Sequence, residues 1–213
     1  MPKIKAIIFD MDGVLIEAKD WHYEALNKAL KLFGMEISRY EHLTTFDGLP
    51  TKDKLKMLSL EKGLPLSLHG FINELKQQYT MEIVHNLCKP KFHHEYALSK
   101  LKNEYYKMAV CSNSIRNSIE TMMQKSSLDG YFEFYISNED VSKGKPDPEM
   151  YNKAIKKLDL SPNECMIVED NENGIRAARA SGANVMIVKE VDEVNYENIK
   201  KHIAIFENKE LGC

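Results

Sequence analysis

The sequence predicts an α/β fold in which a doubly wound parallel sheet forms the core and an all-helical segment is inserted after the first strand. Five short apolar runs have the length of buried strands, and helical patterns separate the four runs in the second half of the chain. Alternation of this kind is typical of a parallel sheet with helices on both faces. The stretch 16–88 holds helical patterns without a convincing strand. We therefore predict a core domain of residues 1–15 and 89–213 and an inserted domain of residues 16–88.

Local signals support each element of the core. The predicted strands are Ile4–Phe9, Met108–Cys111, Phe132–Ile136, Met166–Val168 and Val185–Val188. Between them, 115–123 and 151–158 carry apolar residues at three- and four-residue spacing, which indicates amphipathic helices. Asp147 and Pro148 suit the N-cap and first turn of the second helix, and Gly182 predicts the end of the next one.

The insert is predicted to contain three helices. The apolar face of the first is made by Trp21, Ala25, Ala29, Leu32 and Phe33. This helix ends at Gly34, the second helix runs from Thr51 to Gly63, and the third covers 71–87.

Composition excludes several classes of protein. The 213 residues are 43% hydrophobic and 29% charged, with a net charge of -3, so neither nucleic acid nor an anionic membrane is an expected partner. No apolar run approaches the roughly 18 residues of a membrane span, and the first residues do not resemble a signal peptide. We expect a cytoplasmic monomer. The four cysteines lack a C-x-x-C pair, which favours reduced thiols over disulfides or a zinc site.

Acidic side chains follow two of the predicted strands. Asp10 and Asp12 come directly after the first strand, and Glu169 and Asp170 come after the fourth. Each pair, taken alone, is also compatible with a polar turn. Together, four carboxylates at neighbouring strand ends would repel one another, by about 4 kcal/mol for a close pair at 4 Å and an effective dielectric near 20. A divalent cation with oxygen ligands, Mg²⁺ where a phosphate completes the shell, would offset this repulsion.

Other strand ends supply complementary groups. Ser112 and Asn113 lie between a strand and a helix, where backbone N–H groups can hold phosphate oxygens. Taken alone, Ser112 could equally be a helix N-cap. Lys145, directly before Pro146, could be a solvated loop lysine or could stabilise the transition state of phosphoryl transfer.

These four motifs, in this order and with a helical insert after the first, resemble the haloacid dehalogenase superfamily in its helical-cap branch. The resemblance covers nearly the whole chain and implies a Rossmann-like core with a helical cap domain. It implies that Asp10 is the nucleophile and that Asp12 is the general acid and base. Ser112 and Lys145 would bind the transferring phosphoryl group, with help from the backbone of Asn113.

The resemblance also implies a magnesium site. Asp170, the carboxylate of Asp10 and the main-chain oxygen of Asp12 would hold the ion, and Glu169 would bind it directly or through water. Because dehalogenases of the superfamily lack an acid/base aspartate at the position of Asp12, phosphoryl transfer is favoured over carbon–halogen cleavage. Phosphonate cleavage needs a Schiff-base lysine in the cap. Lys52 and Lys54 lie in the right region, but lysines on a helix surface are usually solvated.

Residues of the cap bear on the reaction. Mutases similar to this chain carry an arginine three residues after a loop glycine, which is Gly48 here, and that place holds Thr51. Lys52 would be a poor replacement because it lacks the bidentate fork of arginine. His22 matches a hinge histidine of the beta-phosphoglucomutase-like relatives and is also compatible with a half-buried structural role. The expected function is a phosphatase, with a beta-phosphoglucomutase-like sugar phosphate mutase as the alternative.

The expected substrate is a small phosphorylated metabolite, a sugar or polyol phosphate, since a closing cap has to exclude bulk water. A phosphoacceptor signalling module is a hypothesis from another class. Receiver domains take the phosphoryl group on a mid-chain strand and lack an insert of about 70 residues, so this hypothesis is disfavoured. A silent binding protein is disfavoured by the presence of every motif residue.

Overall fold

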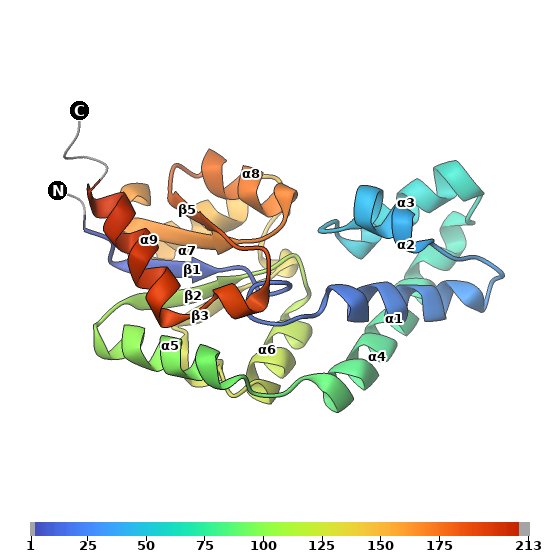
Figure 1. Cartoon of the computed structure of the whole chain (residues 1–213). Coiled ribbons are helices and arrows are strands. Elements are labelled where there is room, and N and C mark those ends of the chain that lie inside the picture. Colours follow the sequence, from blue (N-terminus) through green and yellow to red (C-terminus); the bar gives the residue numbers. More distant parts are fainter. Residues whose placement is uncertain (1–2, 209–213) are drawn as a thin grey trace. The chain divides into compact units, whose positions relative to one another are not determined.

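The computed structural model describes residues 3–208. The chain divides into two compact units. One comprises Ala18–Cys88, and the other comprises the chain up to Glu17 and from Lys89 onwards. We call them the cap unit and the core unit (Figure 1).

The core unit is built on one parallel sheet. Its strands are β1 (Ala6–Phe9), β2 (Lys107–Cys111), β3 (Phe134–Ile136), β4 (Cys165–Glu169) and β5 (Asn184–Ile187), in the order β3-β2-β1-β4-β5. Its α-helices are α5 (Phe92–Asn103), α6 (Arg116–Lys125), α7 (Glu149–Leu158), α8 (Glu172–Ala180) and α9 (Tyr196–Asn208). The predicted doubly wound parallel sheet is confirmed, and its strand ends lie within two residues of the predicted ones.

Both faces of the sheet are covered by helices, as the sequence predicts. On one face, alternate residues of β1 and β4 such as Ala6, Ile8 and Ile167 belong to the same buried cluster as residues of α7 and α8. Helices α5 and α9 contact each other on the other side of the sheet (Figure 1). A sheet buried on both faces explains why its strands are continuous apolar runs.

The register of the sheet brings three strand ends together. β1 pairs with β2 on one side and with β4 on the other, and Phe9 is opposite both Val110 and Val168. The residue after Phe9 therefore lies beside the last residues of β2 and β4. This edge is a topological switch point, where open α/β sheets bind ligands.

The cap unit is helical throughout its described length. It contains α1 (Lys19–Lys31), α2 (Arg39–Glu41), a π-helical segment (His42–Phe46), α3 (Thr51–Lys62), a short 3₁₀ turn (Leu66–Leu68) and α4 (His69–Leu87). The predicted face of α1 is wrong at Leu32, whose side chain is 62% exposed. Leu26 and Leu30 are buried instead, because a helix turns by about 100° per residue, so Leu32 lies roughly 200° around the axis from Leu30 and faces away from the packed side.

Helix ends follow the predicted signals closely. The Asp147 carboxylate accepts a hydrogen bond from the backbone N–H of Glu149 at 3.0 Å, but the N-cap of α7 is Pro148, one residue later than predicted. Gly63 and Gly182 have φ of 70° and 80° after α3 and α8. This left-handed conformation favours glycine and stops a helix.

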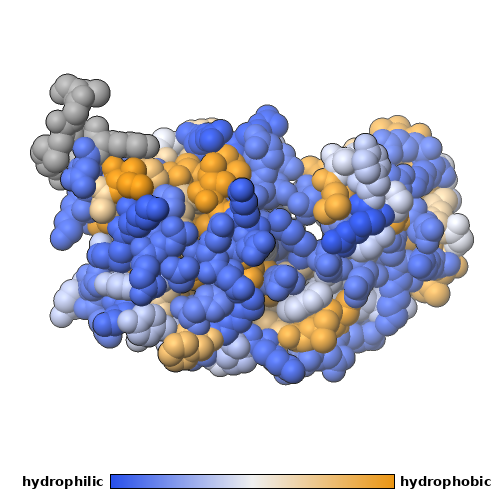
Figure 2. All heavy atoms as spheres, in the orientation of Figure 1, coloured by the Kyte–Doolittle hydropathy of each residue, from blue (hydrophilic) through white to orange (hydrophobic). Residues whose placement is uncertain are grey.

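The cysteines, the longer helices and the surface can each be compared with what the composition predicts. Cys88, Cys111 and Cys165 are buried and free, whereas Cys213 lies outside the described residues. Within 3–208, no helix has both the length and the apolar character needed to cross a membrane. Hydrophilic residues predominate on the face drawn in Figure 2.

Candidate active site

Asp10 lies at the carboxyl end of the central strand. Its backbone N–H continues the sheet by donating to the carbonyl of Val168 at 3.0 Å, and its side chain is buried. Three residues later, at Gly13, the chain turns sharply. Gly13 has a φ of 91° and donates to the carbonyl of Ile16 at 2.7 Å. A side chain at this position would strain the turn that follows Asp12.

Three carboxylates meet at this edge of the sheet. One ligand oxygen from each of Asp10, Glu169 and Asp170 lies within 4.8 Å of the others. Asp10 and Glu169 are buried and Asp170 is partly exposed. The structure thus brings together the acidic residues that follow β1 and those at the end of β4, as predicted from the register of parallel strands.

Lys145 is the counter-charge to these carboxylates. Its Nζ donates to Asp10 Oδ1 at 2.5 Å, to Glu169 Oε1 at 2.7 Å and to the carbonyl of Cys111 at 2.9 Å, which uses all three of its N–H groups. Burial alone would lower the pKa of Lys145, but the charges of Asp10 and Glu169 outweigh burial and raise that pKa. The lysine therefore stays charged although its side chain is only 5% exposed.

Negative charge still exceeds positive charge around Asp10. Burial raises the pKa of Asp10 well above its usual value, Lys145 offsets part of this rise, and the carboxylates of Glu169, Asp170 and Asp12 add to it. Clustered carboxylate oxygens are the hard ligands that Mg²⁺ prefers. A divalent cation would offset the repulsion that these carboxylates add around Asp10, so the residues present fit a magnesium ion.

Asp12 contacts the hydroxyl groups that follow β2. Its Oδ2 accepts a hydrogen bond from Ser114 Oγ at 3.0 Å and a long one from Ser112 Oγ at 3.5 Å. Ser112 Oγ in turn accepts from the backbone N–H of Ser114 at 3.0 Å. Sequence reasoning missed Ser114, although a second hydroxyl two residues after Ser112 was a usable signal.

Asn113 joins two of the predicted motifs. Its Oδ1 accepts from the backbone N–H of Lys145 at 3.0 Å, and its Nδ2 donates to the Lys145 carbonyl at 3.3 Å. A Cβ on Gly144 would lie 2.6 Å from Asn113 Oδ1, so glycine permits this approach. The side chain of Asn113 thus fastens the Lys145 loop to the end of β2, a role that its position in the sequence did not reveal.

Glu169 is held by groups on both of its oxygens. Besides Lys145, Tyr151 donates to Oε1 at 2.5 Å. Oε2 accepts from the backbone N–H groups of Asp170 at 3.1 Å and Asn171 at 3.4 Å. The sequence pattern places Tyr151 in the apolar face of α7, and the missed signal was its hydroxyl, because a buried tyrosine needs a polar partner.

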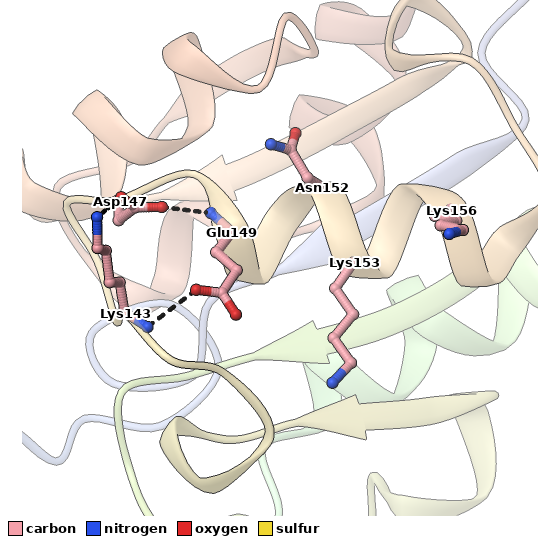
Figure 3. A pocket seen from close by; sticks show the side chains of 6 residues that line it. All are labelled: Lys143, Asp147, Glu149, Asn152, Lys153 and Lys156. Carbon is pink, nitrogen blue, oxygen red and sulfur yellow. Dashed lines mark hydrogen bonds and ion pairs between the residues drawn. The ribbon is translucent and has the colours of Figure 1, made fainter.

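Lys143 lies apart from this cluster. Its side chain is 75% exposed, and its Nζ is 3.9 Å from Asp147 Oδ2. Figure 3 shows Lys143 in a surface hollow beside α7, whose other lining residues are Asp147, Glu149, Asn152, Lys153 and Lys156. Of the two lysines in this loop, Lys145 is the one that reaches the strand ends.

The predicted cap residues belong to the other unit. His22 lies on α1, and its Nδ1 is 3.2 Å from Lys76 Nζ. Gly48 has a φ of 70°, Thr51 is the first residue of α3, and the Lys52 side chain is exposed. Lys54, expected on the helix surface with Lys52, is buried instead because it lies on the side of α3 that carries Leu55 and Leu58.

Comparisons with known proteins agree with this geometry. Residues 7–188 match the family described as haloacid dehalogenase-like hydrolase. A phosphorylated carbohydrates phosphatase of Thermotoga maritima is 26% identical over 84% of this chain and 82% of its own length. A phosphoglycolate phosphatase of Aquifex aeolicus is 27% identical over 86% and 84%. A crystal structure of beta-phosphoglucomutase from Clostridium difficile, 20% identical, has the same fold with a TM-score of 0.83, covering 96% of this chain and 99% of its own.

Proposed function

Because the chain belongs to the haloacid dehalogenase-like hydrolase family, we propose that it is a magnesium-dependent phosphatase that hydrolyses a small phosphomonoester through an aspartyl-phosphate on Asp10. As a member of this family with relatives named as phosphatases, the chain is an enzyme of the phosphoric monoester hydrolase class. The observation that supports the detailed proposal is the meeting of Asp10, Lys145 and Asp170 at one edge of the sheet.

The first half of the reaction forms the aspartyl-phosphate. A carboxylate oxygen of Asp10 attacks phosphorus while the bond from phosphorus to the leaving oxygen breaks, and Asp12 donates a proton to that oxygen. Ser114 Oγ, 3.0 Å from Asp12 Oδ2, orients this carboxyl group. Ser112 and the backbone of Asn113 bind the transferring phosphoryl group.

The second half returns the enzyme to its starting state. Asp12 now accepts a proton from water, the oxygen of that water attacks phosphorus, and inorganic phosphate leaves Asp10 as a free carboxylate. Lys145 gives up its contact with Asp10 Oδ1 to a phosphoryl oxygen, while Glu169 and the carbonyl of Cys111 keep its Nζ in place. Its charge stabilises the negative charge that spreads over the phosphoryl oxygens.

Asp10, Asp170 and the main-chain oxygen of Asp12 would hold magnesium, which when bound neutralises charge on the phosphoryl oxygens. Both oxygens of Glu169 already accept hydrogen bonds from two donors. A carboxylate with this many donors has little capacity left for a metal. We therefore favour water-mediated contact for Glu169 over direct ligation.

The substrate class is a sugar or polyol phosphate. The name of the Thermotoga maritima relative, a phosphorylated carbohydrates phosphatase, supports this class. In the cap unit, Thr51 at the start of α3 takes the place where the mutase-like pattern has arginine, so a guanidinium clamp for a second phosphate is missing at that position. Water is therefore the proposed final acceptor.

A panel of small phosphomonoesters, assayed for release of inorganic phosphate with and without a chelator, tests the proposal. We expect chelator-sensitive turnover that Asp10→Asn reduces at least a thousandfold, because an amide is a poor nucleophile at phosphorus. Circular dichroism checks that the variant is folded. Undiminished turnover by Asp10→Asn would refute the aspartyl-phosphate. Rapid interconversion of beta-glucose 1-phosphate and glucose 6-phosphate would establish the mutase alternative.

A further inference from the structure

We propose that Tyr151 is a positioning residue of this site, and that its hydroxyl acts on Lys145 through Glu169. The inference rests on the proposed function, in which Lys145 binds the transferring phosphoryl group. Tyr151 lies on α7, and its side chain is completely buried in the core cluster that packs on one face of the sheet.

Tyr151 contacts both members of a buried ion pair. Its hydroxyl donates to Glu169 Oε1 at 2.5 Å, and the same oxygen accepts from Lys145 Nζ at 2.7 Å. The Nζ also lies 4.9 Å from the centre of the tyrosine ring, where the face of the ring attracts a cation. The relative exposures of Tyr151, Glu169 and Lys145 are 0%, 1% and 5%, so water does not compete for these contacts.

The hydroxyl has a specific use at this position. An ordinary tyrosine keeps its proton at neutral pH, so the phenol is a donor to the carboxylate of Glu169. The cluster around it contains apolar side chains such as Ala154, Ile155 and Leu158. Phenylalanine would satisfy that packing equally well. The hydroxyl therefore serves the carboxylate of Glu169 rather than the core.

Fixing Glu169 also fixes Lys145. The Oε2 side of Glu169 is held by backbone N–H groups, and the only adjustable partners of its Oε1 are Tyr151 and Lys145 among the residues described. Without the hydroxyl, Oε1 loses one of two donors, and the carboxylate can shift with the lysine that it holds. Lys145 stabilises charge that develops in the transition state, so misplacing it lowers kcat more than it changes KM.

Tyr151→Phe tests this role because it keeps the ring below Lys145 and removes only the hydroxyl. We expect kcat to fall about tenfold and KM to stay within twofold of the wild-type value. Tyr196→Phe is the matched control, since Tyr196 on α9 donates to Glu104 in the same unit, away from the strand ends. We expect both kinetic constants of the control to stay within twofold.

A double-mutant cycle with Glu169→Ala shows whether Tyr151 acts through Glu169. In the Glu169→Ala background, removing the hydroxyl should change kcat less than twofold, because the group on which it acts is gone. A tenfold loss in both backgrounds would overturn the inference, and so would a Tyr151→Phe variant that matches Tyr196→Phe. Melting temperatures identify any variant that has lost its fold.

Binding of inorganic phosphate, measured by calorimetry in the presence of magnesium, separates this inference from the proposed function. We expect Tyr151→Phe to weaken phosphate binding about threefold in the wild-type background and less than 1.5-fold in the Glu169→Ala background. A wild-type chain that binds phosphate with this coupling but releases none from any phosphomonoester refutes the proposed function alone. Turnover by the wild type without coupling between Tyr151 and Glu169 refutes the inference alone.

Discussion

Glu169 shows how a single side chain organises the site. It accepts hydrogen bonds from Lys145 and Tyr151 on one oxygen and from the backbone on the other. The carboxylate of Glu169 lies against α8 in the space that a side chain at position 174 would need. A Cβ on Gly174 would lie only 1.9 Å from Glu169 Oε1. The glycine in this helix is thus required by the carboxylate rather than by the backbone conformation.

Gly174→Ala should consequently impair both activity and stability. The added methyl group must push Glu169 away from Lys145, and overpacking of a buried site costs about 1–3 kcal/mol. We expect kcat to fall at least tenfold, measured as phosphate release, and the free energy of unfolding to fall by this amount in urea titrations.

Gly70→Ala provides the matched control. Gly70 is also helical, on α4, but no heavy atom lies within 4 Å of the position of its Cβ. Alanine there should leave kcat unchanged and stability the same or up to about 1 kcal/mol higher. Equal kinetics for Gly174→Ala and Gly70→Ala would show that Glu169 tolerates displacement.

At the scale of elements, α5 is tied to the segment after β5 through a buried histidine. His94 Nε2 contacts the carbonyl of Val191 at 2.9 Å, in the 3₁₀ turn Val191–Glu193. Since a carbonyl can only accept, Nε2 carries the proton. The pKa of His94 is lowered to about 4, chiefly by burial and also by His93 and Lys91, whereas the hydrogen bond to Val191 and the carboxylate of Asp192 oppose the shift in part.

Stability should therefore fall as the pH is lowered toward 4. Between the ordinary histidine pKa near 6.5 and the value of about 4, the unfolded chain binds a proton that the folded His94 does not. His94 makes its full contribution to the free energy of unfolding above pH 6.5. Below that pH the contribution falls by at most about 1.4 kcal/mol per pH unit. Urea titrations followed by far-UV circular dichroism measure it, because the single tryptophan, Trp21, reports on the cap unit.

His94→Gln tests this assignment because glutamine can still donate to the Val191 carbonyl but does not titrate. In the variant, the free energy of unfolding should depend on pH at most about half as strongly as in the wild type between pH 6.5 and 4.5. His85→Gln, at an exposed position of α4, is the control and should keep the wild-type slope. A His94→Gln variant with the full slope would assign the dependence to other groups.

At the scale of the whole molecule, surplus negative charge in the core unit should link stability to the proposed binding of magnesium. One oxygen from each of Asp10, Glu169 and Asp170 lies within 4.8 Å of the others, and only Lys145 among the described residues forms an ion pair with Asp10 or Glu169. A ligand that binds the folded state alone stabilises it by about 2.7 kcal/mol at 100 times its dissociation constant. Magnesium should therefore raise the melting temperature of the chain.

Asp170→Asn separates charge repulsion from metal binding. Without magnesium, this variant should melt at or above the wild-type temperature, because one of three crowded carboxylates has become neutral. With magnesium, its melting temperature should no longer rise. Differential scanning calorimetry with and without a chelator provides both values, and an undiminished rise in Asp170→Asn would place the metal elsewhere.

Local patterns in the sequence were sufficient for much of this protein. Apolar runs, helical spacing and capping residues predicted the five strands and most helices, because these signals depend on neighbours a few residues apart. The parallel sheet then followed from alternation, and its register predicted that Asp10, Ser112 and Asp170 lie at one edge. The error at Leu32 concerned which side of α1 packs, because Leu32 shares a helical row with Ala25 and Ala29, whereas the buried leucines lie on the next row.

The contacts that shape the site could be seen only in the folded chain. Tyr151 resembles an ordinary core residue in the helical pattern, and Gly174 resembles part of a turn. Their roles depend on Glu169, which is 18 residues from Tyr151 and lies on a different element. The hydrogen bonds between Asn113 and Lys145 join residues that are 32 positions apart in the sequence. Packing between separate elements determines such pairs, and sequence spacing carries no signal for them.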